Sequence, residues 1–428
     1  MSGARLVPVS AGFMCSPSRL WHRISPMIFC YLFVLSYGSR PVRGQYLYDG
    51  NNNLPPFGGF SGSDFDTISL QNGNLHLHIP IGSWKQRGGQ TVSLFLAYDT
   101  PTWMRTTTIT TINRQRYYIT SYVDPSFQDP SYWRFVDSAS GWRVSTSASS
   151  NTKCPGSNNP TILKNQYALV DPEGTKHPTN LQTDSLSCFQ PITQAPPMDG
   201  IGVIANLKAP ILLKDGTQST ATGFEDTNGN EFGATDTLNR TLVTVTNGSG
   251  YTIYAVTDSN GTAQNYRVDY TTMSTATNYC GSLNHPPLWT CNETTSNLQV
   301  PSKLTLPDNQ TYQFAWFQNT PGELESVTLP AGATITYSYS TPPCTHGPPG
   351  LGQDSTTVPY DCRAQVATRT VTVNGVNSVW SYGGGAVIDP LGNEQVHYFN
   401  NIVANGETSS GSVETQVNYY SGSATSGT

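Results

Sequence analysis

Charged side chains are scarce in this sequence, and the scarcity limits the classes of protein to which it can belong. Asp, Glu, Lys and Arg make up 12% of the 428 residues, whereas aromatic residues reach 11%. A disordered chain has the opposite balance. Helical periodicity is nearly absent after the N-terminal segment, and no pair of the eight cysteines has C-x-x-C spacing. We therefore expect neither disorder along the whole chain, nor a helical fold, nor a C-x-x-C zinc or redox site.

Long hydrophobic runs are missing too, apart from one near the N-terminus. Met27–Leu35 (MIFCYLFVL) follows several basic residues, and no acidic residue occurs before Asp49. This order is typical of a secretory signal, and the run is too short for a comfortable membrane anchor. Small side chains at Val42 and Gly44 predict cleavage before Gln45. Residues 1–44 are thus predicted to be a signal peptide; a retained anchor is the alternative, and a shorter signal after a miscalled start codon leaves export unchanged.

Removal of the signal peptide makes the chain strongly acidic. It takes away five Arg and no acid, so 17 basic residues face 28 acidic ones and the net charge falls from −6 to about −11. Nucleic acid and anionic membrane surfaces repel such a chain. We expect a secreted, extracellular or cell-surface protein with no nucleic-acid partner and no stable membrane span.

Six cysteines remain after cleavage, which is an even number in an exported chain. Such a set suggests disulfide bonds, with fifteen connectivities open. The simplest pairing joins sequence neighbours, and buried unpaired thiols are the alternative. The disulfide candidates are Cys154 with Cys188, Cys280 with Cys291, and Cys344 with Cys362.

What the sequence does have is strand and turn chemistry. Thr, Val, Tyr and Phe favour pleated surfaces, and 39 Gly and 30 Pro favour turns. Leu75–Ile81 alternates apolar residues with polar ones or Pro, the period of a half-buried strand. Asn72-Gly73 separates it from the run Thr67–Leu70, and Asn-Gly between two such runs predicts a hairpin.

The same order of strand, D-x-x-G or N-G turn, and return strand recurs to the end of the chain. Examples of these turns lie at 171–174, 226–230, 258–261 and 389–392. A single hairpin is marginal in water, so the units must join a larger sheet. The sequence therefore predicts an all-β fold of serial antiparallel hairpins with little or no helix after the signal. Ser, Gly and Asn predict a loop at 145–160.

At this point the string of motifs resembles a known family, the secreted RHS/YD-repeat proteins. Asp66–Tyr98 resembles their opening, with a Gly turn, an I-P strand and an R-G-G turn before a strand ending in Tyr. Gly141–Arg143 and Leu169–Pro178 resemble the next pieces. D-T-N-G-N at 226–230 and D-T-L-N-R at 236–240 are similar to the family's D-x-N-G-N and D-T-L-G-R. The likeness is scattered over roughly residues 60–400 and rests on the order of the motifs.

The resemblance implies an extended, curved sheet that forms a hollow shell or repeat array, as in tripartite toxin shells and teneurins. The implied partner is a C-terminal cargo or toxin polypeptide, or a cell-surface protein or glycan. The strict repeat is hardly present, since Ile335–Tyr339 matches only its first half, and Asp389–Gly392 only superficially matches the self-cleaving segment. The 384 residues after cleavage suffice only for a partial shell.

These observations divide the chain into five segments. They are a signal peptide at 1–44, an extended leader at 45–64, an N-terminal β region of RHS type at 65–200, a degenerate YD/RHS-like hairpin array at 201–404, and a flexible Ser/Gly/Thr tail at 405–428.

Metal and cofactor chemistry has little support in the sequence. His76 and His78 share one strand face at a spacing that can hold a metal, but no third ligand lies nearby in sequence, and a solvent-facing polar pair is favoured. Asp226, Asn228 and Asn230 resemble a calcium loop, yet Glu231 stands where the EF-hand needs Gly, and Asx turns explain the pattern without a cation. We expect no metal and no cofactor.

Catalysis is likewise unmarked, so we name no catalytic residue. A glycosidase needs two facing carboxylates, and Asp64, Asp66, Glu323 and Glu325 are available without any sign of a pair. Rings that can stack on a glycan are the alternative, against ordinary cross-strand packing. The candidates for stacking are Trp103, Tyr117, Tyr118, Tyr122, Tyr132 and Trp133. The predicted function is a non-catalytic exported scaffold; a β-rich carbohydrate-binding or adhesin module is second, and a secreted β-fold glycoside hydrolase is third.

Overall fold

A computed structural model gives the fold of this protein. Residues 45–428 form one unit. The described residues are 59–85, 91–123, 133–137, 141–154, 161–186, 188–208, 210–220, 223–233, 235–257, 261–281, 288–341, 360–403 and 410–424. The predicted signal peptide, its cleavage point and most of the predicted leader lie outside these ranges.

Strands account for the regular structure, and the described residues contain no α-helix. Accordingly, no helix in the described ranges is long and apolar enough to cross a membrane. The all-β prediction is confirmed. The sequence favoured it because β-branched and aromatic residues alternate with polar ones between frequent turn residues.

The first sheet has five antiparallel strands in the order β1-β2-β3-β4-β7. Its strands are β1 (Phe60–Gly62), β2 (Asp66–Ser69), β3 (Leu75–Lys85), β4 (Thr91–Asp99) and β7 (Trp133–Asp137). The predicted Asn72-Gly73 turn joins β2 to β3, with Gly73 at a φ of +68°. Regular structure begins at Phe60, inside the predicted leader, because β1 pairs with β2.

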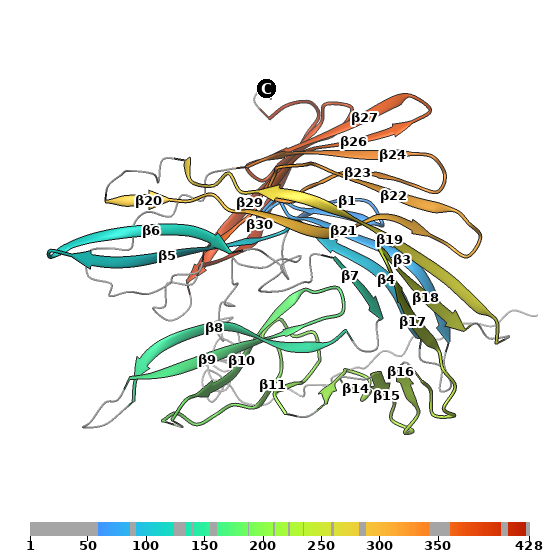
Figure 1. The fold of residues 1–428 in the computed structure, drawn as a ribbon, viewed down its shortest axis with the longest axis horizontal. Coiled ribbons are helices and arrows are strands. Elements are labelled where there is room, and N and C mark those ends of the chain that lie inside the picture. The colour runs from blue at the N-terminus through green and yellow to red at the C-terminus, as the bar shows by residue number, and fades with distance from the viewer. Residues whose placement is uncertain are drawn as a thin grey trace, which may run out of the picture. The chain divides into compact units, whose positions relative to one another are not determined.

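The largest sheet has twelve strands that pair in the order of the chain, from β17 to β30 (Figure 1). Every neighbouring pair is antiparallel. Its strands are β17 (Val243–Gly248), β18 (Tyr251–Thr257), β19 (Ala263–Ala276), β21 (Thr295–Thr305), β22 (Thr311–Trp316), β23 (Leu324–Thr328), β24 (Thr334–Ser340), β26 (Gln365–Val373), β27 (Val376–Gly383), β28 (Ala386–Ile388), β29 (Glu394–Val403) and β30 (Ser410–Tyr420). Within the described ranges β17 and β30 do not pair with each other, so this sheet keeps two edges.

Four smaller sheets complete the fold. The first is β10-β9-β8, from β8 (Arg143–Lys153), β9 (Thr161–Val170) and β10 (Lys176–Asp184). Two more are β11 (Gln194–Ala195) with β12 (Ala205–Asn206), and the run β13 (Ile211–Leu212), β14 (Gln218–Thr220), β15 (Gly223–Glu225) and β16 (Glu231–Gly233). The last, β20-β6-β5-β25, joins β5 (Trp103–Ile112) and β6 (Gln115–Val123) to β20 (Trp289–Cys291) and β25 (Tyr360–Cys362). The β20–β6 pair is parallel, an exception to serial antiparallel hairpins.

The main apolar core joins the first sheet to the twelve-stranded sheet. Leu75 and Tyr98 of the first sheet are fully buried in one cluster with Leu304 and Val327 of the large sheet. Burial of this kind is the main favourable term in folding. The core therefore spans both sides of the division predicted at residues 200 and 201.

Two segments that the sequence assigned to irregular chain are strands. The predicted flexible tail at 405–428 contains β30, which pairs along its length with β29. The predicted loop at 145–160 contains most of β8, which pairs with β9. Ser and Gly are abundant in both, but ladder hydrogen bonds are made by the backbone and do not require apolar side chains. Strands β30 and β8 thus occupy positions where the Ser, Gly and Asn content of the sequence predicted a flexible tail and a loop.

Candidate functional site

A single five-residue turn recurs seven times in the described part of the chain. In each copy the first residue's N–H donates to the fifth residue's carbonyl, and the fourth residue's N–H donates to the first residue's carbonyl. The copies begin at Asp171, Leu213, Asp226, Asp236, Leu306, Leu329 and Asp389. The repeated structural unit is thus the turn itself, and it joins six pairs of antiparallel neighbours: β9–β10, β13–β14, β15–β16, β21–β22, β23–β24 and β28–β29.

The fourth residue of every copy has a positive φ, which explains why it is always Gly or Asn. The φ angle runs from 56° at Asn239 to 92° at Gly174. Gly has no Cβ to clash there, and Asn tolerates this region better than most residues. Asn239, which stands where the RHS/YD pattern has Gly, therefore adopts the conformation that the pattern requires.

An Asp at the first position organises the turn through its carboxylate. Asp226 Oδ1 accepts the backbone N–H groups of Asn228 and Asn230, each at 2.8 Å, and the side chain of Asn230 donates to Oδ2. The hydrogen bond from the Asn230 side chain, followed by those from the backbone, lowers the pKa of Asp226. Asp389 repeats this arrangement with Asn393. Turn chemistry thus accounts for the calcium-like sequence at 226–230.

A buried ion cluster of Asp66, Tyr337 and Arg369 ties the first sheet to the large one. Arg369 donates to both oxygens of Asp66 at 2.6 and 2.9 Å, and the Tyr337 hydroxyl donates at 2.8 Å. Asp66 is 0% exposed and Arg369 is 5% exposed. Burial, followed by the charge of Asp66, raises the pKa of Tyr337 well above its ordinary value. The cluster joins residues 303 positions apart in the chain.

The four carboxylates considered for glycosidase chemistry have different surroundings. Asp64 is exposed, whereas Asp66 is committed to Arg369 and Tyr337. Glu323 is 3% exposed and accepts the Gly322 N–H, and burial raises its pKa. Glu325 is half-buried. Asp66 cannot act as nucleophile or base while it holds the Arg369 guanidinium, so this set gives catalysis no support.

His177 is a charged histidine held between two carboxylates. Its Nδ1 lies 2.5 Å from Asp199 Oδ2 and its Nε2 lies 3.4 Å from Asp171 Oδ2. Burial by itself lowers the pKa of His177, but the hydrogen bonds to Asp171 and Asp199 outweigh it and raise the pKa to about 9. The imidazolium therefore links β10 to the turn that begins at Asp171 and to the segment that carries Asp199.

This link makes stability fall at alkaline pH. Because the pKa of His177 is about 9 in the folded chain and 6.5 ordinarily, its contribution is complete below pH 6.5 and is lost as pH rises through 9. We expect the urea midpoint to fall between pH 7 and 9.5, and His177→Gln to remove that part of the fall. His397→Gln, which leaves the cluster intact, should keep the wild-type slope. If the urea midpoint fell with pH equally in the wild type and in His177→Gln, the raised pKa of His177 would not be the cause of the fall.

His76 and His78 do not form the solvent-facing pair that the sequence favoured. His76 is 3% exposed, and its Nδ1 lies 3.0 Å from Oδ1 of the fully buried Asp99. His78 stacks on Phe95 with ring centroids 4.3 Å apart. Burial is the largest influence on the pKa of His78 and lowers it, although Glu173 acts in the opposite direction. The expectation failed because the strand is covered on both faces at His76.

The neighbour pairing of cysteines is confirmed for two disulfides. Cys154–Cys188 and Cys280–Cys291 are bonded, with Cα atoms 5.5 and 5.7 Å apart. Cys362 is disulfide-bonded as well, and its predicted partner Cys344 lies outside the described residues. Disulfides of this kind persist in oxidising compartments.

Peptide mapping without reductant tests this framework. We expect linked peptides containing Cys154 with Cys188 and Cys280 with Cys291 in exported protein. A reduced and remapped sample is the control, since it must release all of them. Alkylation of Cys280 or Cys291 before reduction would contradict the framework.

The rings considered for glycan stacking belong mostly to the interior. Trp103 is 0% exposed and donates its Nε1–H to the Pro321 carbonyl at 2.7 Å, and Tyr122 is buried in the same cluster. Tyr117 is half-buried, and Tyr118 packs against that cluster. Trp133 is half-buried and makes edge contacts with Trp316 at 5.3 Å. Tyr132 lies outside the described residues. Cross-strand packing therefore explains Trp103, Tyr122 and Trp133.

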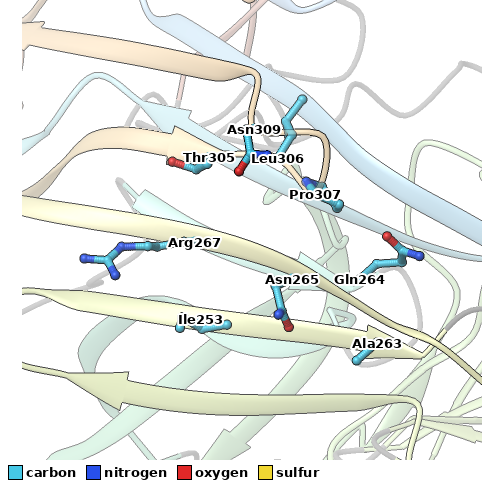
Figure 2. A pocket seen from close by; sticks show the side chains of 9 residues that line it. All are labelled: Ile253, Ala263, Gln264, Asn265, Arg267, Thr305, Leu306, Pro307 and Asn309. Atoms are coloured by element: carbon cyan, nitrogen blue, oxygen red, sulfur yellow. The ribbon is translucent and has the colours of Figure 1, made fainter.

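The described surface includes a hollow over the large sheet and another over the β8-β9-β10 sheet. One of about 340 Å³ lies over β18, β19 and the turn after β21, and Figure 2 shows Asn265, Arg267 and Asn309 around it. Its lining is polar. The other, of about 530 Å³, lies over the β8-β9-β10 sheet between Tyr167, Phe189 and Leu207. The second has the mixed apolar and polar lining that is common in small-molecule sites.

No protein-family model matches the chain. No curated protein matches it either. The resemblance to RHS/YD-repeat proteins is thus an expectation from the motifs of the sequence.

Sequence reasoning missed the groups that hold the sheets together. Arg369 and Tyr337 gave no local signal, because their partner Asp66 lies near the other end of the chain. His177 has no acidic residue next to it in the sequence, yet Asp171, six residues earlier, opens a D-x-x-G turn. The fixed geometry of that turn is the signal that could have suggested the pair.

Proposed function

We propose that this chain is a non-catalytic exported scaffold of the RHS/YD-repeat kind, acting in encapsulation, cell contact or competition between cells. The observation that carries the proposal is the twelve-stranded sheet, whose strands pair with one another in chain order. Its connections β21–β22, β23–β24 and β28–β29 are copies of the five-residue turn. Such a sheet grows by adding hairpins, which suits a surface or wall better than a reaction centre.

The interior supports a rigid scaffold. One apolar cluster and one buried ion cluster join the first sheet to the large sheet. Two disulfides bind loops to the body of the fold. A well-packed core and cross-links of this kind raise stability without providing a reactive group.

The curvature of the sheet and its part in a partial shell belong to the proposal. The two edges, at β17 and β30, leave the large sheet able to accept further strands. A cargo or toxin polypeptide, or a cell-surface protein or glycan, is the proposed partner. The 201–404 segment is then a degenerate array and the 65–200 segment its N-terminal region.

Export and partnership are tested together on a tagged chain expressed in its own host. We expect the mature protein in the medium or at the cell surface, beginning at Gln45, with a polypeptide that stays bound through high-salt washes. Phe33→Arg, which places a charge in the signal's apolar run, is the control and should stop export. Retention of the wild-type chain in the cytosol, or hydrolysis of a polysaccharide panel by the purified chain, would overturn the proposal.

Carbohydrate binding is the second candidate, and the hollow over the β8-β9-β10 sheet favours it. Tyr167 and Phe189 face this hollow with Thr146, Thr183 and Lys208, a mixture of rings and polar groups that suits a sugar. A glycan array with wild type and Phe189→Ala tests it. Binding that the substitution abolishes would favour this candidate, and absence of binding would dismiss it.

A further inference from the structure

Two buried ring nitrogens in β3 point at one carboxylate without a hydrogen bond to it. His76 Nε2 lies 3.8 Å from Glu173 Oε2, and His78 Nδ1 lies 3.5 Å from Glu173 Oε1. Neither nitrogen has a hydrogen-bond partner. Buried polar atoms are almost always paired, so these two atoms require an explanation.

The other nitrogen of His76 is already fixed. Its Nδ1 lies 3.0 Å from Asp99 Oδ1, and Asn74 donates to the same oxygen at 2.9 Å. With Asp99 as a carboxylate, Oδ1 accepts a hydrogen bond from Nδ1–H of His76, and the lone pair of the neutral imidazole is then on Nε2, on the side of Glu173. A carboxylate that orients a histidine in this way is the usual outer partner of a metal-binding imidazole.

We infer that His76, His78 and Glu173 bind a divalent transition-metal ion of the zinc type, with Asp99 positioning His76. Two ligands of one tetrahedral zinc, each about 2.0–2.2 Å from it, stand about 3.4 Å apart. The separations of 3.5 and 3.8 Å are close to that value and too long for good hydrogen bonds.

The ligand set is not preformed. No group of three or more His, Cys, Asp and Glu side chains in the described ranges is placed to hold a metal ion as it stands. Glu173 is the most exposed member, because its side chain is 49% exposed and lies in the D-P-E-G turn before β10, whereas the His76 side chain is 4% exposed. Binding therefore requires the side chains, Glu173 first, to move toward the ion. A bound cation would also join β3 to the β9–β10 turn, and the inference does not depend on the proposed scaffold role.

Zinc titration of the untagged, metal-free mature chain tests the inference. We expect one Zn²⁺ per chain by calorimetry, and a higher melting temperature because the metal binds the folded form. Glu173→Gln should weaken zinc binding by about tenfold or more. Loss of a residue that only orients a ligand costs at least about tenfold in metal affinity, and loss of a ligand itself should cost no less. Glu231→Gln makes the same change at an exposed glutamate of β16 and should bind as the wild type does.

Cobalt supplies a second measurement that does not depend on stability. Co²⁺ should give visible absorption bands of low coordination in the wild type, and His78→Gln should abolish them. Zinc binding and the cobalt bands of the wild type should both weaken below pH 6, because imidazoles must be neutral to bind a metal. Failure of the wild type to bind Zn²⁺, or equal binding by Glu173→Gln, would overturn the inference.

Discussion

Replacing Arg369 with methionine is expected to lower the free energy of unfolding by about 3–5 kcal/mol, because it leaves a buried carboxylate without its cation. Asp66 is 0% exposed and receives two of its hydrogen bonds from this guanidinium. The loss should be measured as a fall in the urea midpoint with an unchanged slope. It should also expose the contact between the first sheet and the large sheet to proteolysis.

Arg267→Met is the matched control for this experiment. Arg267 also pairs with an aspartate, Asp269, but its side chain is 44% exposed. An exposed pair contributes only about 0–1 kcal/mol, so the control should be nearly silent. A double change of Asp66→Leu with Arg369→Met should recover part of the loss, since it removes the stranded charge. Equal effects of Arg369→Met and Arg267→Met would contradict the role given to the buried cluster.

Replacing Gly73 with alanine is the second change with a large expected effect: it should lower the free energy of unfolding by about 2–5 kcal/mol. Gly73 has a φ of +68°, which costs an alanine about 1–2 kcal/mol. A Cβ there would also clash with Cβ of Gln365 and lie 2.8 Å from its Cα. Such overpacking costs about 1–3 kcal/mol more. Since the Val366 N–H donates to the Gly73 carbonyl, relief of the clash must disturb this hydrogen bond too.

Gly375→Ala separates the cost of the positive φ from the cost of overpacking. Gly375 has a φ of +79°, and a Cβ there meets nothing within 4 Å. Chemical denaturation of both variants should therefore show about 1–2 kcal/mol for Gly375→Ala and a clearly larger loss for Gly73→Ala. If the two losses agree, the contact between Gly73 and Gln365 is not tight in solution.

Local features of this fold could be predicted from the sequence because local chemistry determines them. The Asn72-Gly73 hairpin and the D-x-x-G turns have backbone angles that few residues adopt, so Gly and Asn mark them. Two cysteine pairs were predicted because their members are consecutive cysteines in the sequence, 34 and 11 residues apart. Strand β30 was missed because its Ser and Gly content favoured irregular chain.

The groups that join distant strands could not be predicted, because no local pattern encodes register between them. The sequence offers Asp66 as a candidate acid, whereas the structure places the Arg369 guanidinium beside it. Likewise, no third ligand lies near His76 and His78 in the sequence, because Glu173 lies in the turn between β9 and β10 of another sheet. Burial decides the role of such residues, and burial is a property of the assembled sheets.

The pairing of Asp66 with Arg369 also has a consequence for the order of synthesis. The buried ion pair cannot form until Arg369, 303 residues after Asp66, has been made, which at about 5–20 residues per second takes roughly 15–60 s. Apolar partners of the first sheet such as Val268, Leu304 and Val327 are made earlier in that interval. The carboxylate of Asp66 is therefore the last group at this contact to find its partner, and the fold is completed only after β26 has emerged.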